Sequence, residues 1–199
     1  MKSALLNKLR SELELHINKL AFIIAKTHID PNTLTLTSLV AAFMSIPLAL
    51  LTRNGLVVAA IISITGLLDV IDGAVARVSR RSSLRGALLD SFIDRLCEAI
   101  LTIAMLILGL NPQIIVVFFT FSFLASYLRA KGESLGVSLS GVGLMERPER
   151  LIGLITVALT VDLAGITAAN TLLLVLAVLT GITVLQRFLY IWRRLSSVK

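Results

Sequence analysis

Four aspartates in two hydrophobic segments are the residues of this chain whose types and spacing could do chemistry. Asp69 and Asp72 are three residues apart, and Asp90 and Asp94 are four apart, so each pair would lie on one face of a helix. An antiparallel helix pair, joined by the short basic turn at residues 78–85, would bring the four carboxylates together. Because four unpaired anions in hydrocarbon are very costly, we expect divalent cations among them.

The neighbouring residues indicate phosphate chemistry. Carboxylate oxygens suit Mg²⁺, Mn²⁺ or Ca²⁺ rather than zinc, and a site with two metal ions clamps the attacking and leaving oxygens in phosphoryl transfer. Gly73 would let a ligand approach the helix backbone, and Arg77 could bind a phosphate through two hydrogen bonds. The competing interpretation is that the aspartates only pair with Arg77, Arg85 and Arg95. That pairing would need neither the glycines nor the helical spacing, so we favour the metal site.

The elements that position these residues are predicted to be membrane helices. Of the 199 residues, 56% are hydrophobic, and the mean hydropathy is +0.92, whereas soluble domains have roughly 45–50% apolar residues. Several apolar runs approach the roughly 20 residues that span a bilayer. The single cysteine, Cys97, excludes an intrachain disulfide. The net charge of +7 fits membrane topology and attraction of anionic substrates better than nucleic-acid binding.

We predict an all-α polytopic membrane protein with one domain over residues 1–199. Residues 1–30 are expected to form an amphipathic helix at the membrane interface; the alternative is a cytosolic helix packed on the bundle. Residues 31–199 are expected to form a bundle of six transmembrane helices. The predicted spans are 34–52, 56–77, 86–109, 113–131, 150–167 and 171–192.

The distribution of basic residues predicts the topology. Six spans place both termini on one side of the membrane. Of the 19 Lys and Arg residues, all but Arg53 and Arg95 fall on that side. By the positive-inside rule, both termini and the aspartates face the cytoplasm, and the protein lies in the cell membrane.

The segment from Asp69 to Asp94 resembles the signature of the CDP-alcohol phosphotransferases, Asp-x-x-Asp-Gly-x-x-Ala-Arg, eight residues, then Gly-x-x-x-Asp-x-x-x-Asp. Every fixed position is matched, by Asp69, Asp72, Gly73, Ala76, Arg77, Gly86, Asp90 and Asp94. The resemblance implies an enzyme in which an acceptor hydroxyl attacks a CDP-alcohol and CMP leaves. It also implies a homodimer.

The resemblance assigns roles to particular residues. Asp69, Asp72 and Asp90 would bind two Mg²⁺ ions, with Mn²⁺ as a substitute, and Asp94 would be the general base and could touch the second metal. The CDP-lipid would be bound by the start of the first span, by the signature and by the basic turn, through Asn32, Thr33, Leu34, Thr35, Gly73, Ala76, Arg77 and Ser83.

Three further arginines are candidates for binding a phosphate on the acceptor. Arg129, Arg150 and Arg187 would form a pocket if they converge, although topology alone also places arginine at cytoplasmic span ends. Their surroundings, with Glu-Arg-Pro-Glu-Arg-Leu-Ile at residues 146–152, resemble the branch of the family that uses inositol 1-phosphate, which comprises the bacterial phosphatidylinositol phosphate synthases and the archaetidylinositol phosphate synthases. Lys131 and Arg147 are second choices.

Several alternatives stay open at this point. The lipid donor could carry archaeol or diacylglycerol, and the short chain favours archaeol. The acceptor could be glycerol 3-phosphate instead of inositol phosphate (inositol 1-phosphate or 1-myo-inositol 3-phosphate). A cation transporter is the alternative from another class, but its carboxylates should be spread over several depths of a pore, whereas here they cluster at one level.

Overall fold

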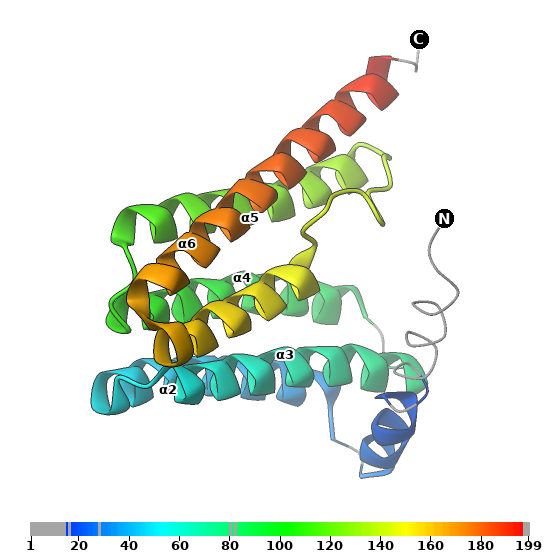
Figure 1. Cartoon of the computed structure of the whole chain (residues 1–199). Coiled ribbons are helices and arrows are strands. Elements are labelled where there is room, and N and C mark those ends of the chain that lie inside the picture. The colour runs from blue at the N-terminus through cyan, green and yellow to red at the C-terminus, as the bar shows by residue number, and fades with distance from the viewer. Residues whose placement is uncertain (1–14, 16, 28, 80, 82, 197–199) are drawn as a thin grey trace. The chain divides into compact units, whose positions relative to one another are not determined.

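The computed structural model describes residues 15, 17–27, 29–79, 81 and 83–196, and helices dominate it (Figure 1). No strand occurs among these residues, so the all-α prediction is confirmed. Residues 17–26 belong to an N-terminal helical segment. The long helices that follow are α2 (Pro31–Thr52), α3 (Gly55–Val78), α4 (Leu84–Ile107), α5 (Pro112–Ser134) and α6 (Arg147–Ser196).

Helix α6 contains the last two predicted spans and breaks at Gly165. This residue has φ 83° and ψ 169°, a backbone conformation that glycine adopts readily and other residues do not. The boundary predicted at residues 168–170 is therefore wrong, because those residues are helical. Instead of ending a span, Asn170 binds the start of α5, since its side-chain oxygen accepts a hydrogen bond from the backbone N–H of Asn111 at 2.8 Å.

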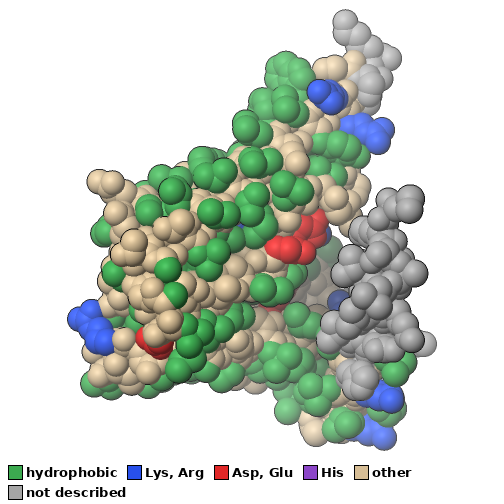
Figure 2. Space-filling model, viewed as in Figure 1, with side chains coloured by type: hydrophobic (Ala, Val, Ile, Leu, Met, Phe, Trp, Pro, Cys, Tyr) green, Lys and Arg blue, Asp and Glu red, His purple; other side chains and the backbone are tan. Residues whose placement is uncertain are grey.

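Within the described part of the chain, four helices are long and apolar enough to cross a membrane, namely α2, α3, α5 and α6. Helix α4 has a similar length but carries Asp90, Asp94, Arg95 and Glu98. Hydrophobic side chains also cover much of the visible surface of the helices (Figure 2). These apolar helices make the chain an integral membrane protein.

The chain divides into two compact units, and α2, α3 and α4 each contribute to both. The first unit comprises Met1–Ala42 and Ile64–Cys97, and the second comprises Phe43–Ser63 and Glu98–Lys199. The first therefore contains all four aspartates of the signature, and the second contains the three candidate arginines.

In the first unit, the N-terminal helical segment packs on α3. Ala21 is fully buried in a cluster with Ile71, Ala74 and Val75. On the outward side Phe22 and Ile23 are 53% and 62% exposed, so the segment has a packed face and an exposed apolar face. The packed face matches the alternative of a helix packed on the bundle, and the interfacial position stays a prediction. The part of the predicted interfacial helix before residue 15 lies outside the described residues.

In the second unit, two charged residues bind backbone groups at helix ends. The Asp162 carboxylate accepts a hydrogen bond from the N–H of Leu56 at 2.8 Å, near the start of α3. The guanidinium of Arg53 donates to the carbonyl of Ile107 at the end of α4. Such ends leave unsatisfied backbone groups that are costly in a membrane, so these charges have a structural role.

Candidate active site

Helices α3 and α4 bring three of the four signature aspartates together. One carboxylate oxygen each from Asp69, Asp72 and Asp90 lies within 4.8 Å of those of the other two. Asp72 is buried, at 3% exposed, and the other two are half-buried. Ligand oxygens at roughly 2.0–2.6 Å from one cation are up to about 5 Å apart. The three carboxylates therefore fit a divalent cation.

Asp94 lies outside this group, which differs from the expectation of four converging carboxylates. It is buried in α4, at 9% exposed, and its Oδ2 lies 3.1 Å from Nη1 of Arg95. Helical spacing explains why Asp90 and Asp94 share a face, but a separation of one turn displaces the second carboxylate along the axis by about 6 Å. Three carboxylates thus form one close group, and Asp94 is not a member of it.

Thr35, on α2, contacts the buried aspartate of the cluster. Its hydroxyl donates a hydrogen bond of 2.7 Å to Oδ2 of Asp72, and both residues are buried. The start of α2 positions this hydroxyl: Asp30 accepts a hydrogen bond from the N–H of Asn32 at 3.2 Å, and Pro31 is the first helical residue, a position that proline favours. Thr35 therefore fixes the orientation of one candidate metal ligand.

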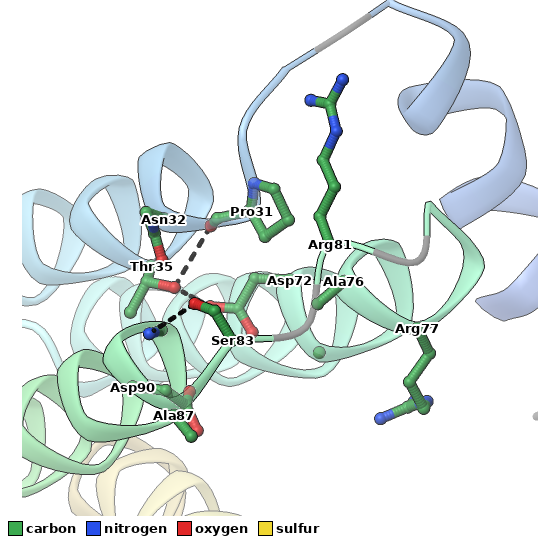
Figure 3. Close-up of a pocket in the computed structure, with 12 residues that line it drawn as sticks. Pro31, Asn32, Thr35, Asp72, Ala76, Arg77, Arg81, Ser83, Ala87 and Asp90 are labelled. Carbon is green, nitrogen blue, oxygen red and sulfur yellow. Dashed lines mark hydrogen bonds between the residues drawn. The ribbon is translucent and has the colours of Figure 1, made fainter.

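A pocket of about 200 Å³ lies beside Asp72 and Asp90 (Figure 3). Six of the residues predicted to bind the CDP-lipid line it: Asn32, Thr35, Gly73, Ala76, Arg77 and Ser83. Residues that the sequence analysis did not assign to binding also line it, namely Pro31, Arg81, Gly86 and Ala87. Most of the residues predicted to bind the nucleotide thus line one cavity next to the carboxylates, and nucleotide binding there stays a prediction.

Thr33 and Leu34 do not line this pocket. Residues 32 and 35 are three apart and share a face of α2, whereas the two residues between them point elsewhere. Leu34 packs against the cluster around Ile71, and Thr33 is exposed. The prediction treated residues 32–35 as one binding segment. Because these residues are helical, only the first and the last of them face the pocket.

The rim of the pocket is set by the first turn of α4. The Oγ of Ser83 accepts a hydrogen bond from the N–H of Gly86 at 3.0 Å, as an N-cap residue does. A Cβ on Gly86 would lie 3.1 Å from that oxygen and 3.3 Å from Oδ1 of Asn32, so glycine permits the close approach of α4 to α2. A Cβ on Gly73 would meet only Nη1 of Arg77, at 3.4 Å, which leaves the backbone open to a ligand.

The basic side chains around the pocket point in different directions. Figure 3 shows Arg81 extending away from Asp72 and Asp90, and the guanidinium of Arg77 lies beside Gly73. A diphosphate bound in the pocket could therefore reach Arg77 near the glycine.

In the second unit, the three candidate arginines have different surroundings. Arg150 and Arg187 are buried, at 1% and 2% exposed, whereas the side chain of Arg129 is 45% exposed and pairs with Glu133 at 3.1 Å. The second choices also differ, since Lys131 is exposed and Arg147 is half-buried.

Both buried arginines hold the loop at residues 135–146. Nη1 of Arg150 donates to the carbonyl of Met145 at 3.3 Å, and Nε of Arg187 donates to that of Val142 at 2.9 Å. Arg150 also forms an ion pair with Glu98 at 2.9 Å. Sequence reasoning missed Glu98, and the available signal was an acidic residue within an apolar helix, which is costly without a partner.

Comparison with known proteins agrees with this geometry. The chain is 39% identical over 186 residues to an archaetidylinositol phosphate synthase of Aeropyrum pernix, which covers 93% of this chain and 95% of the relative. The phosphatidylinositol phosphate synthase of Mycobacterium tuberculosis with CDP-DAG bound superposes with a TM-score of 0.76 at 25% identity, over 88% of this chain and 93% of that chain. The same enzyme in complex with manganese and citrate gives the same TM-score and identity, over 88% of each chain.

The family model for CDP-alcohol phosphatidyltransferase matches residues 28–192. This range includes all the residues that line the pocket, the three clustered carboxylates and the candidate arginines. The chain therefore belongs to the CDP-alcohol phosphatidyltransferase family of enzymes.

Proposed function

We propose that this protein transfers a phosphatidyl-type lipid group from a CDP-lipid to inositol phosphate and releases CMP. The observation that carries the proposal is a cluster of three carboxylates beside a pocket, in a chain that aligns over 93% of its length with an archaetidylinositol phosphate synthase. Membership of an enzyme family favours this reaction over cation transport. The name of that relative favours an archaeol lipid, whereas the solved relative holds CDP-DAG.

Asp69, Asp72 and Asp90 would hold a divalent cation, Mg²⁺ or Mn²⁺, and with Asp94 the site would accommodate two. Manganese in the structure of the mycobacterial enzyme supports a divalent ion, and the mutual distances of the three carboxylates fit one. When bound, the cation neutralises charge on the diphosphate and on the departing CMP.

The chain's own residues would bind and orient the two substrates. Asn32, Thr35, Gly73, Ala76, Arg77 and Ser83 would hold the cytidine diphosphate part of the donor in the pocket, with Arg77 on a phosphate. Arg129, Arg150 and Arg187 would bind the phosphate of the acceptor. Asp94 would accept the proton of the attacking hydroxyl at a carboxylate oxygen.

We also propose six membrane crossings, with both termini and the pocket on the cytoplasmic side and residues 1–30 at the interface. The distribution of basic residues supports this topology, and four helices are apolar enough to cross. Helix α4 would be the crossing whose charges are offset by ion pairs. The family resemblance supports a homodimer.

An acceptor screen tests the proposed function. Purified protein in detergent, with CDP-archaeol or CDP-diacylglycerol and Mg²⁺, is supplied in parallel with inositol 1-phosphate, 1-myo-inositol 3-phosphate, glycerol 3-phosphate or no acceptor. We expect CMP release and a lipid product only with an inositol phosphate. Turnover with glycerol 3-phosphate alone would replace this proposal with a phosphatidylglycerol phosphate synthase, and ion flux in liposomes without CMP release would favour a transporter.

A further inference from the structure

Glu98 is a buried carboxylate that the proposed reaction does not use. It lies in α4 and is 4% exposed. One of its oxygens accepts a hydrogen bond from Nε of Arg150 at 2.9 Å, and the other accepts from Nη2 at 3.4 Å. This is the two-point geometry that a planar guanidinium forms with a carboxylate, and it fixes the plane of the arginine side chain.

Two further contacts complete the surroundings of this guanidinium. Nη2 of Arg150 donates to the hydroxyl of Ser126, on α5, at 3.2 Å, and Nη1 donates to the carbonyl of Met145 at 3.3 Å. A guanidinium has five N–H donors. Glu98 and Ser126 occupy the Nε and Nη2 side, and so only Nη1 has a hydrogen left for a ligand.

Arg187 has a different kind of environment. Its Nε and Nη1 donate to the backbone carbonyls of Val142 and Ala125, at 2.9 Å and 2.7 Å. The nearest carboxylate among the described residues is that of Glu146, whose oxygen lies 3.9 Å from Nη2. The positive charge of a buried guanidinium is neutralised less by carbonyl groups than by a carboxylate. The guanidinium of Arg187 therefore attracts an anion more strongly than one paired with a carboxylate does.

We infer that Glu98 is a positioning residue for the acceptor phosphate: together with Ser126, it orients Arg150 so that Nη1 meets the phosphate, while Arg187 supplies the less compensated charge. The inference rests on the proposed function, because it takes a phosphorylated acceptor as the ligand of these arginines. Glu98 acts through Arg150 and touches no substrate. The alternative is that the ion pair only ties α4 to α6.

The test is Glu98→Gln, which keeps the size of the side chain and removes its charge. A glutamine amide cannot accept hydrogen bonds at both of its terminal atoms, so the guanidinium loses its two-point partner. We expect the KM for the acceptor to rise about tenfold or more, the loss of one hydrogen bond to a charged group, and the KM for the CDP-lipid to stay the same. Glu98→Asp, which restores the charge, should recover part of the loss.

Glu149→Gln is the matched control, because Glu149 adjoins Arg150 in the sequence but is exposed. It should leave both KM values unchanged. Ser126→Ala is a milder variant that keeps the ion pair, and we expect it to raise the acceptor KM about twofold to fivefold, the loss of one hydrogen bond. This variant keeps the inference testable if Glu98→Gln fails to fold.

A double-mutant cycle tests whether Glu98 acts through Arg150, and the comparison of the two KM values separates positioning from a purely structural role. If Glu98 acts through Arg150, adding Glu98→Gln to Arg150→Ala should change the acceptor KM no further. Additive effects, equal changes in both KM values, or an unchanged or lower acceptor KM in Glu98→Gln would overturn the inference. If the wild-type protein uses another phosphorylated acceptor, the proposed function fails, and the cycle is run with that acceptor and still decides the role of Glu98.

Discussion

The hydrogen bond from Thr35 to Asp72 is a direct polar contact from α2 to the carboxylate cluster. It joins two buried side chains 37 residues apart in the sequence, at 2.7 Å. Partners of metal ligands hold the ligand oxygen in place and tune its basicity. Thr35 therefore has a part in the site apart from lining the pocket.

Replacing Thr35 with valine should weaken divalent-cation binding by about 10- to 100-fold, because the Asp72 carboxylate loses the group that orients it. Calorimetric titration with Mn²⁺ measures this without turnover. Thr37→Val is the matched control, since Thr37 lies on the exposed side of the same helix and donates only to the carbonyl of Thr33. Equal affinities for Thr35→Val and the control would contradict the role.

Asp94→Asn should abolish turnover and largely spare CDP-lipid binding, because Asp94 lies outside the three-carboxylate cluster and its main role would be as the base for the acceptor hydroxyl. Binding can be followed with a fluorescent CDP-lipid, and turnover by CMP release. A loss of CDP-lipid binding as large as that in Asp69→Asn would contradict the assignment of Asp94 as the base.

At the scale of helices, two glycines of α3 serve different purposes. A Cβ on Gly55 would collide with the carbonyl oxygen of Ala158, whereas a Cβ on Gly73 would meet only the end of the Arg77 side chain. Gly55 therefore permits two helices to pack, and Gly73 leaves space for a ligand. Substitution by alanine separates these roles.

Gly73→Ala should fold at least as well as the wild type, since alanine favours a helix interior by about 1 kcal/mol, yet it should raise the KM for the CDP-lipid. Gly55→Ala should instead lower the unfolding temperature by several degrees, as a backbone collision of about 1–3 kcal/mol would. Thermal unfolding in detergent and steady-state kinetics provide both readouts. Normal CDP-lipid kinetics in Gly73→Ala would show that no ligand approaches that backbone.

Helix positions could be predicted from the sequence because long apolar runs have few other structures available in a membrane. The break at Gly165 could not, since a single glycine in such a run is compatible with a continuous helix until packing selects its left-handed conformation. The rotation of one helix about its axis relative to its neighbour also could not be predicted, because a periodic pattern describes each helix separately. The spacing predicts that Asp94 shares the face of Asp90, but only the structure separates it from the cluster.

At the scale of the whole molecule, the positions of charged residues could be predicted from the sequence where they lie close together in the chain. The signature predicted the carboxylates and most of the pocket, because those residues lie within short segments whose periodicity is known. Glu98 and Arg150 are 52 residues apart, and their pairing depends on how distant helices pack, which local patterns do not encode.

The proposed topology predicts which residues an impermeant thiol reagent reaches. In a Cys97→Ala background, Gln113→Cys at the start of α5 should react from outside intact cells. Ser196→Cys, at the end of α6, should react only after permeabilisation, because the positive-inside rule holds that end in the cytoplasm. The reverse pattern would mean that the protein is inverted in the membrane, and labelling of both from outside would require an even number of crossings between residues 113 and 196 instead of the three proposed.

The central claim is that Asp69, Asp72 and Asp90 together hold the divalent cation that the transfer requires. Electron paramagnetic resonance of Mn²⁺ with purified protein tests it most directly, because bound and free ion give different signals. We predict that the wild type and Glu149→Gln, a control that removes an exposed carboxylate elsewhere, bind Mn²⁺ alike, and that Asp69→Asn, Asp72→Asn and Asp90→Asn each lose most of the bound signal. Undiminished Mn²⁺ binding in folded protein with these substitutions would contradict the account.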